Sequence, residues 1–287
     1  MIQGPQSLTF CRCRGRFYTD LKSSRNVDIQ LYSRTMKNRY WIILFFALFA
    51  QQTMAQVNVR DSITAAWMFS FNLSGHLVSG DAGDQYANAL GLGMDIEKRT
   101  RTNWLFGVDG TYMFGSEVNN VFDIFGHLAT EQGFILGLNG QYATVEFLYR
   151  GFNVGGHVGK LFNIMGPNPN SGLLVKLGAG YVQNKIFIRA PGTDIPQIQG
   201  EYAKGYDRLH EGLAIKQYVG YMHSGNSRTV NFQVGFEFMQ GFTKNVRGFN
   251  YDTGMPDNAQ KLDLYFGIKA SWVLPIYDKN QQKFYYY

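Results

Sequence analysis

Five histidines, together with serines near one of them, are the residues of this chain best suited to nucleophilic or acid–base chemistry: His76, His127, His157, His210 and His223. Ser70, Ser74 and His76 fall on one face of a segment in which apolar and polar residues alternate. A serine–histidine–acid set is the arrangement that many hydrolases and acyltransferases use. However, this face is the polar one, and the chain has neither an HExxH nor a GxSxG motif. Hydrogen bonding inside the fold is therefore favoured over catalysis, and we expect no catalytic residue.

Four aspartates fall in expected loops and offer the carboxylate oxygens that Ca²⁺ prefers: Asp81, Asp84, Asp252 and Asp257. Their spacing fits no EF-hand loop, so acids in solvated loops are the favoured interpretation. The sequence therefore predicts no metal site and no cofactor.

Eight charged residues lie on the polar faces of alternating segments: Asp95, Glu97, Asp109, Glu146, Lys176, Lys216, Glu237 and Lys269. A buried charge needs a partner of opposite sign. If the segments close into an eight-stranded barrel, the lumen is just wide enough to be filled by side chains. We therefore expect these residues to form a plug of ion pairs and hydrogen bonds. The alternative, an ion-selective lining, needs a wider tube.

A two-residue alternation positions these side chains and recurs along the whole chain, whereas the 3.6-residue period of helices is nearly absent. Eight segments carry the alternation: 67–77, 90–97, 104–115, about 143–162, 173–181, 213–221, 230–238 and 262–272. A phase slip near Arg150 and Gly151 suggests a β-bulge in the fourth segment. The pattern predicts an all-β fold of eight antiparallel strands.

The connections between the segments alternate in length. Those at 98–103, 163–172 and 224–227 are short, and those at 79–89, 116–142, 190–210 and 240–260 are mostly longer. Short turns on one side and long loops on the other are typical of an up-and-down barrel in a bacterial outer membrane, with its short turns in the periplasm. A secreted lipocalin-like barrel, with its apolar face inside, is the alternative.

Three features favour a transmembrane barrel. The segments are long enough to cross a bilayer when tilted, and glycines on the polar faces suit a crowded lumen. Aromatic residues lie near the ends of apolar faces, as in an interfacial girdle: Trp67, Trp104, Tyr149, Tyr181, Tyr221 and Trp272. In the last two strands the predicted lipid-facing residues are Phe232, Val234, Phe236, Leu264, Phe266 and Ile268, and Thr243 is expected in an outer loop.

Residues 36–55 have the three-part layout of a secretory signal peptide. Basic Lys37 and Arg39 precede a ten-residue apolar run over 41–50, and Thr53 and Ala55 stand at positions −3 and −1 of a cut before Gln56. The run is too short to cross a bilayer as a helix. We expect residues 1–35 to be an upstream extension from a misplaced start; the alternative is a disordered cytoplasmic arm.

Charge and cysteine content change when the leader, residues 1–55, is left out of the count. The whole chain has a formal net charge of +6. Residues 1–55 hold eight of the 27 Lys and Arg and two of the 21 Asp and Glu, so residues 56–287 hold nineteen of each and are neutral. Neutrality gives no indication of a nucleic-acid partner. Both cysteines, Cys11 and Cys13, also lie in the leader, so the mature chain has no disulfide framework.

A few local strings accompany the signal and the eight segments: YDRLHEG at 206–212, GFT at 241–243, WVLPIY at 272–277 and FYYY at 284–287. With them, the chain from about 60 to 287 resembles the small outer-membrane β-barrel proteins of Bacteroidota. The resemblance implies location and architecture and transfers no functional residue. The last strand is expected to end near Leu274, before a short tail, which leaves open whether Trp272, Tyr277 or Tyr287 serves as an assembly signal.

The function predicted from these features is non-enzymatic. We expect an integral outer-membrane barrel that has a structural or partner-binding role, or assists envelope assembly or secretion, through its long outer loops. Its expected partners are outer-membrane lipid and a protein that the sequence does not identify. A lipid-modifying enzyme and a narrow channel are the alternatives.

The signal layout makes a prediction about processing. Translation should start at Met36, and the mature protein should begin at Gln56. N-terminal peptide analysis of the protein isolated from the cell envelope checks this expectation. Peptides from residues 1–35 in the mature protein would show that the extension is part of it.

Overall fold

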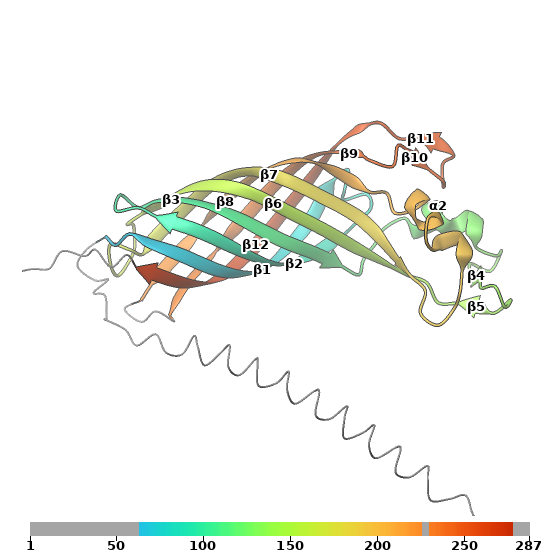
Figure 1. Ribbon diagram of the computed structural model, residues 1–287, viewed down its shortest axis with the longest axis horizontal. Helices are drawn as coiled ribbons and strands as arrows, with labels where there is room; N and C mark the ends of the chain where they lie inside the picture. Colours follow the sequence, from blue (N-terminus) through green and yellow to red (C-terminus); the bar gives the residue numbers. More distant parts are fainter. Residues whose placement is uncertain (1–62, 226–229, 278–287) are drawn as a thin grey trace, which may run out of the picture. The chain divides into compact units, whose positions relative to one another are not determined.

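All eight alternating segments form strands in the structure, a computed structural model that describes residues 63–225 and 230–277 (Figure 1). The expected upstream extension and signal peptide, and the chain after residue 277, lie outside the described residues. The strands are β1 (Ala66–Gly80), β2 (Asn88–Arg99), β3 (Trp104–Gly115), β6 (Glu146–Phe162), β7 (Gly172–Arg189), β8 (His210–Ser224), β9 (Asn231–Asn245) and β12 (Gln260–Tyr277).

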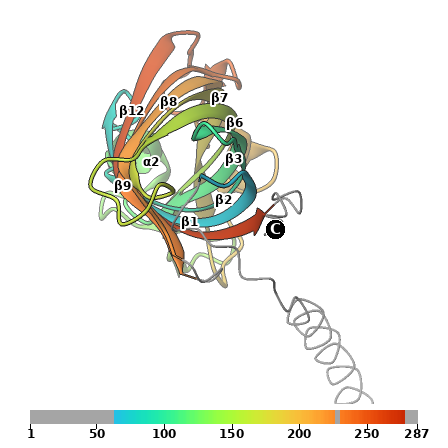
Figure 2. The same cartoon turned by 90° about the vertical axis from the view of Figure 1, so that its left-hand side faces the viewer.

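The eight strands pair in chain order and close into a ring. The order is β1-β2-β3-β6-β7-β8-β9-β12, each neighbour is antiparallel, and β12 returns to pair with β1 from Ala66↔Tyr277 to Gly80↔Asp263. Figure 2 shows the strands around their common interior. Closure leaves no unpaired edge among these strands. The predicted eight-stranded antiparallel up-and-down barrel is confirmed.

The outer wall of the barrel is a continuous apolar surface. Outward side chains such as Leu73, Val108 and Phe236 are exposed, whereas the residues between them are buried. An apolar surface on every side of a barrel is far larger than the patches that water-soluble proteins expose. The wall therefore faces lipid, and the barrel is transmembrane. In the described part of the chain, no helix is long and apolar enough to cross a membrane.

A girdle of aromatic and basic side chains surrounds the short-turn end of the wall. Trp67, Trp104 and Trp272 point outward there. Lys98 Nζ lies 5.3 Å from the centroid of the Trp67 ring, and Lys160 Nζ lies 5.0 Å from that of Trp104. Aromatic rings and long cationic side chains are typical of the level where lipid headgroups meet the acyl region.

The predicted lipid-facing residues lie on the outer wall. Phe232, Val234, Phe236, Phe266 and Ile268 are exposed. Leu264 has the same alternation phase but is half-buried.

Tyr149, expected in the outer girdle, instead points inward and is fully buried. The bulge predicted nearby is also wrong, because β6 pairs with β3 and β7 without interruption. The apparent phase slip has another cause. Near the long-loop end of β6 the inward face is itself apolar, and Phe147 and Tyr149 pack beneath the loops.

The last two strands extend beyond their predicted ends. Thr243 is not in an outer loop: it lies in β9, is buried, and its Oγ1 donates to Asp263 Oδ2 over 2.8 Å. Strand β12 continues past Leu274 to Tyr277. Alternation of apolar residues marks only the lipid-spanning part of a strand, so the pattern fades before the hydrogen-bonded ladder ends.

Sharp turns close the barrel at one end. In the turn between β2 and β3, Asn103 has a φ of 59°, a conformation that asparagine tolerates better than most residues. Thr100 N donates to Trp104 O over 2.8 Å, and Asn103 N donates to Thr100 O over 3.1 Å. These bonds fix the register in which β2 and β3 present their inward carboxylates.

Three long loops form a folded cap at the other end of the barrel (Figure 1). We define the cap as residues 116–145, 190–209 and 246–259. It contains short elements that the sequence pattern did not predict: α2 (Val121–Phe125), η1 (Gly126–Leu128), β4 (Ile135–Leu136), β5 (Tyr142–Ala143), η2 (Pro196–Ile198), η3 (Tyr202–Gly205), β10 (Phe249–Asn250) and β11 (Met255–Pro256). Phe125 and Ile198 from the cap join inward residues of the barrel such as Tyr149 in one apolar cluster.

The lipid-facing wall yields a mutational prediction. Val234→Arg, on the exposed side of β9, should impair folding into bilayers by about 2–4 kcal/mol if the residue lies at the bilayer midplane, because arginine is costly there. Urea titration of the protein folded into vesicles measures the change. Asn258→Arg, at an exposed cap position, is the matched control and should be tolerated. Equal stability of the two variants would argue that β9 does not cross lipid.

Candidate functional site

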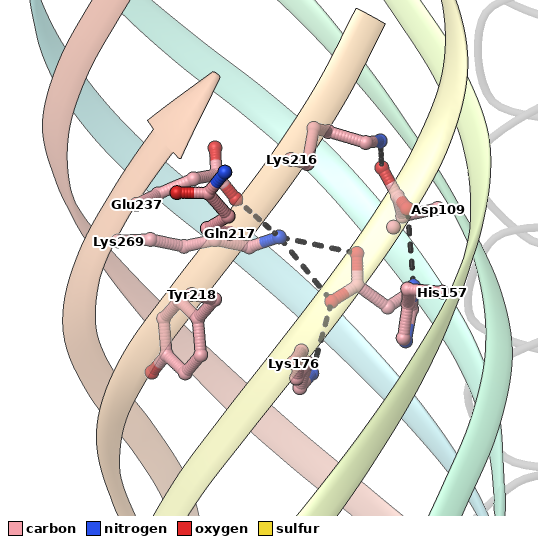
Figure 3. Close-up of a pocket in the computed structure, with 10 residues that line it drawn as sticks. Asp109, His157, Lys176, Lys216, Gln217, Tyr218, Glu237 and Lys269 are labelled. Carbon is pink, nitrogen blue, oxygen red and sulfur yellow. Dashed lines mark hydrogen bonds and ion pairs between the residues drawn. The ribbon is translucent and has the colours of Figure 1, made fainter. Parts of the chain in front are cut away.

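A layer of charged side chains crosses the middle of the lumen (Figure 3). We define the charged layer as Asp95, Glu97, Asp109, His157, Lys176, Lys216, Glu237 and Lys269, with His76 at its margin. All eight strands contribute, because each inward face places a residue at this level. Most of these side chains are less than one-tenth exposed, so each charge depends on its neighbours for stabilisation.

The three lysines of the layer reach carboxylates on other strands. Lys269 Nζ lies 3.4 Å from Asp95 Oδ2 and 3.3 Å from Glu237 Oε2. Lys176 pairs with Glu97 and lies 3.9 Å from Asp95 Oδ2. Each lysine therefore ties together strands that do not pair through their backbones.

Lys216 is the third lysine of the charged layer and contacts residues of β3 and β6. Its ammonium pairs with Asp109 and donates to Asn153 Oδ1 over 3.3 Å. Asn72 Nδ2 donates to Asp95 Oδ1 over 2.6 Å. These amides provide hydrogen bonds to the layer without adding charge.

His157 lies between two carboxylates. Its Nε2 is 2.8 Å from Glu97 Oε1, and its Nδ1 is 3.1 Å from Asp109 Oδ1. A neutral imidazole donates from only one nitrogen, so both contacts are hydrogen bonds when the ring is protonated. One imidazolium and three ammonium groups then balance the four carboxylates of the layer. His76, whose Nε2 lies 3.1 Å from Glu237 Oε1, adds a polar contact at the edge.

The lumen is closed at this level and on both sides of it. The space left within the charged layer is about 20 Å³, roughly room for one water molecule. Toward the short turns lies an apolar layer: Met68, Leu105, Leu161, Leu174, Tyr218, Met222 and Val273. Toward the long loops, the cluster shared with the cap fills the interior. Among residues 63–225 and 230–277, the charged and apolar layers together form a plug in the lumen.

The end of the barrel beyond the apolar layer is sealed by hydrogen bonds. Arg99 is buried there and donates from Nε to Thr64 O over 3.0 Å and from Nη1 to Asn170 O over 3.4 Å. Asn103 Nδ2 donates to Pro169 O over 3.1 Å, which links two of the turns. The turn between β6 and β7 thereby packs against its neighbours.

Seven of the eight predicted lumen residues lie in the charged layer. Glu146 does not, and this prediction was wrong. It is the first residue of β6, its side chain is 45% exposed, and its nearest cation is Arg189 Nη1 at 3.9 Å. Without a bulge in β6, Glu146 has the same phase as Arg150 and Phe152, so it lies on the outward face of the strand.

His157 was not among the predicted lumen residues, whereas His76 was expected to hydrogen-bond inside the fold and contacts Glu237. His157 has the same alternation phase as Gly155 and Gly159, and that phase was the available signal. The phase places a side chain inside the barrel, but the contact with Glu97 and Asp109 depends on the pairing of β6 with β3 and of β3 with β2.

The other residues considered for chemistry have structural contacts. His76 contacts Glu237, and no hydrogen bond joins it to Ser70 or Ser74. His127 Nε2 lies 2.9 Å from Tyr206 Oη, and His223 stacks on Phe232 with centroids 5.1 Å apart. His210 is buried at the start of β8.

The aspartates weighed as calcium ligands are dispersed. Asp81 Oδ2 accepts from Leu262 N over 2.6 Å, Asp252 pairs with Arg208, and Asp257 Oδ2 lies 3.2 Å from Lys261 Nζ. Within residues 63–225 and 230–277, no group of three or more His, Cys, Asp or Glu side chains is arranged to hold a metal ion.

Several solved structures are similar to the chain. Neisserial surface protein A is 11% identical, with 72% of this chain and 97% of that chain covered and a TM-score of 0.40. Ail, the attachment invasion locus protein of Yersinia pestis, is 11% identical, with 74% and 99% covered and a TM-score of 0.38. The outer membrane protein OprG from Pseudomonas aeruginosa is 11% identical, with 75% and 99% covered and a TM-score of 0.37.

No protein-family model matches the sequence, and no curated protein matches it. The architecture given above rests on the strand pairing of this chain.

The balance of charge in the layer predicts an unequal response to single and double substitution. Lys216→Met should destabilise the barrel by about 3–5 kcal/mol, because it leaves one carboxylate of the sealed layer without compensation. Lys216→Met combined with Asp109→Asn restores neutrality and should cost less than the single change. Urea unfolding in vesicles measures both.

If the double variant loses as much stability as Lys216→Met and Asp109→Asn lose together as single variants, the two residues are not energetically coupled and the charge-balance argument fails. A large, reproducible conductance from the pure protein in planar bilayers would contradict a closed layer.

Proposed function

We propose that this chain is a non-conducting, non-enzymatic barrel of a bacterial outer membrane that holds a partner protein on its long-loop cap. The short turns would face the periplasm and the cap would face outward, as the loop lengths favour. The expected signal peptide, which would export the chain, stays a prediction from the sequence.

The observation that carries this proposal is the apolar surface of the cap. Phe122 is 74% exposed, Leu138 is 69% exposed and Tyr142 is 60% exposed, all in the loop over 116–145. Phe134 and Leu136 in the same loop are also exposed. Five large apolar side chains in one loop form the kind of surface that marks a binding site for another protein.

Ion pairs join two of the three loops of the cap, 190–209 and 246–259. Arg247 donates to Asp207 from Nε over 3.1 Å and from Nη2 over 2.6 Å, and Arg208 pairs with Asp252. Burial acts to raise the pKa of Asp257, yet the neighbouring Lys261 ammonium keeps that pKa below its ordinary value. The loop over 116–145 is tied to the loop over 190–209 by His127 Nε2, which lies 2.9 Å from Tyr206 Oη, and a surface ordered before binding loses less entropy when a partner docks.

The sealed lumen supports the same assignment over a channel. Charged and apolar layers fill the interior, so traffic through the barrel would require the plug to be dismantled.

A photo-crosslinking amino acid in the cap tests the proposal. Placed at Leu138, it should give a discrete protein adduct in living cells, whereas the same amino acid at Thr253, an exposed cap position on another loop, should give little. In a separate measurement without the crosslinker, Leu138→Ser should lower the affinity for the partner identified by crosslinking at least about tenfold, which corresponds to about 1.4 kcal/mol of binding free energy. Co-purification of the partner with the variant measures this change.

The substitution should leave the stability of the barrel unchanged, because the side chain is mostly exposed. Absence of any adduct from Phe122, Leu138 and Tyr142 alike would refute a partner site on this loop.

A further inference from the structure

A groove of about 620 Å³ is cut into the outer wall near the long-loop end of β1, β2, β3 and β6. Outward residues form most of its wall, among them Gly75, Leu77, Leu90, Phe114, Leu148 and Arg150, and the inward residues His76 and Ala89 also line it. Its volume is within the range of small-molecule binding pockets. A hollow on a lipid-facing wall loses dispersion contacts unless an apolar chain enters it.

One row of paired residues runs through this groove on four strands and continues beyond it onto a fifth, β7. Gly75 is opposite Leu90, Leu90 opposite Phe114, Phe114 opposite Arg150, and Arg150 opposite Lys185. Directly opposed residues on neighbouring strands point to the same face with their Cβ atoms about 5 Å apart. The row therefore passes from a gap at the glycine, over a leucine and an aromatic ring, to two adjacent cations.

The gap exists because residue 75 is a glycine. A Cβ added there would meet only Leu90 Cδ2, at 3.8 Å, which is an ordinary contact. No crowding of the backbone or of side chains requires glycine at this position, unlike at Gly80, where a Cβ would lie 2.3 Å from Leu262 O. Gly75 thus leaves open a space that a side chain would fill.

The two cations at the other end of the row have no acid partner. Within the described ranges, neither Arg150 nor Lys185 forms an ion pair. Arg150 Nη1 donates to Tyr149 O over 2.8 Å, and its Cζ lies 5.7 Å from the centroid of the Phe187 ring. Glu117, on the rim of the groove, accepts from Asn88 Nδ2 over 2.8 Å. Two adjacent half-buried cations on a lipid-facing wall form a positive site that an anionic headgroup at the membrane surface would neutralise.

We infer that this row is a binding site for a phosphorylated membrane lipid. The phosphate lies between Arg150 and Lys185, where guanidinium and ammonium groups both donate charge-assisted hydrogen bonds. An acyl chain follows the row over Phe114 and Leu90 into the gap at Gly75. The apolar groove and the cations belong together, because a free phosphate would use only the cations and an uncharged lipid only the groove.

The wild-type protein in detergent is offered dioleoyl phosphatidate or dioleoyl phosphatidylcholine, and bound lipid is counted by native mass spectrometry. Phosphatidate should be retained roughly tenfold better, the factor expected for one well-formed additional charged contact. The double variant Arg150→Gln/Lys185→Gln should lose this preference. No preference in the wild type, or a preference that survives in the double variant, overturns the inference.

Two matched controls separate this site from general effects. Lys98→Gln/Lys160→Gln removes two outward cations that lie over tryptophans at the other end of the barrel, and it should keep the preference. Gly75→Leu should lower retention of both lipids, whereas Gly110→Leu, at an outward glycine where a Cβ would meet only Asn153 O at 4.0 Å, should not. If only the Lys98/Lys160 variant loses the preference for phosphatidate, the lipid binds at the short-turn end of the barrel and the inference is overturned.

Three further measurements keep the inference testable. Millimolar inorganic phosphate should not displace bound phosphatidate; displacement would mean that the cations bind free phosphate and that the groove plays no part. A photoreactive phosphatidate should crosslink to wild-type residues 146–152 or 183–187, which tests the site even if a variant fails to fold. Leu138→Ser in the cap should bind lipid normally, so a failure here is distinct from a failure of the partner-binding proposal.

Discussion

The structure depends on one constraint: every charge inside a closed, narrow barrel must be neutralised inside that barrel. Water cannot enter in quantity, and the polar groups of the outer wall point away from the lumen. The four carboxylates of the charged layer are met by three lysines and by His157, which contacts two of them at once. Removing one member of such a set destabilises the barrel by more than the intact ion pair stabilises it, because the remaining charge stays buried.

This constraint also links strands that the backbone does not pair. Lys269 on β12 reaches Asp95 on β2, with β1 between them. Lys216 on β8 reaches Asp109 on β3, across β6 and β7. Backbone hydrogen bonds join each strand only to its neighbours, so these contacts across the lumen brace the barrel against changes in its cross-section. The apolar layers above and below exclude water, which strengthens the ion pairs between them.

Much of this fold could be predicted from the sequence because a lipid-facing strand has a strict two-residue period. The period placed Asp95, Asp109 and Lys216 inside and Val234 and Phe236 outside. It failed at the start of β6: Tyr149 is inward and apolar because the cap packs on it, and Glu146 lies on the outward face because no bulge reverses the phase of the strand. The partners of each charge could not be predicted, since they depend on the register of pairing and on which strands face one another across the lumen. The folded elements of the cap had no periodic signal of any kind.

A plugged interior moves the function of the molecule to its surfaces. The barrel presents two that its own stability does not explain: exposed Phe122 and Leu138 on the cap, and the row from Gly75 to Lys185 on the wall. A strand that only had to cross lipid would gain apolar contact from a larger side chain at residue 75, where there is room for one. Arg150 and Lys185 would likewise be replaced at lower cost by uncharged residues if no anion met them. The glycine and the two cations each lower the stability of the isolated barrel, and they lie in one row of paired residues. A single bound lipid that uses both ends of that row offsets both losses.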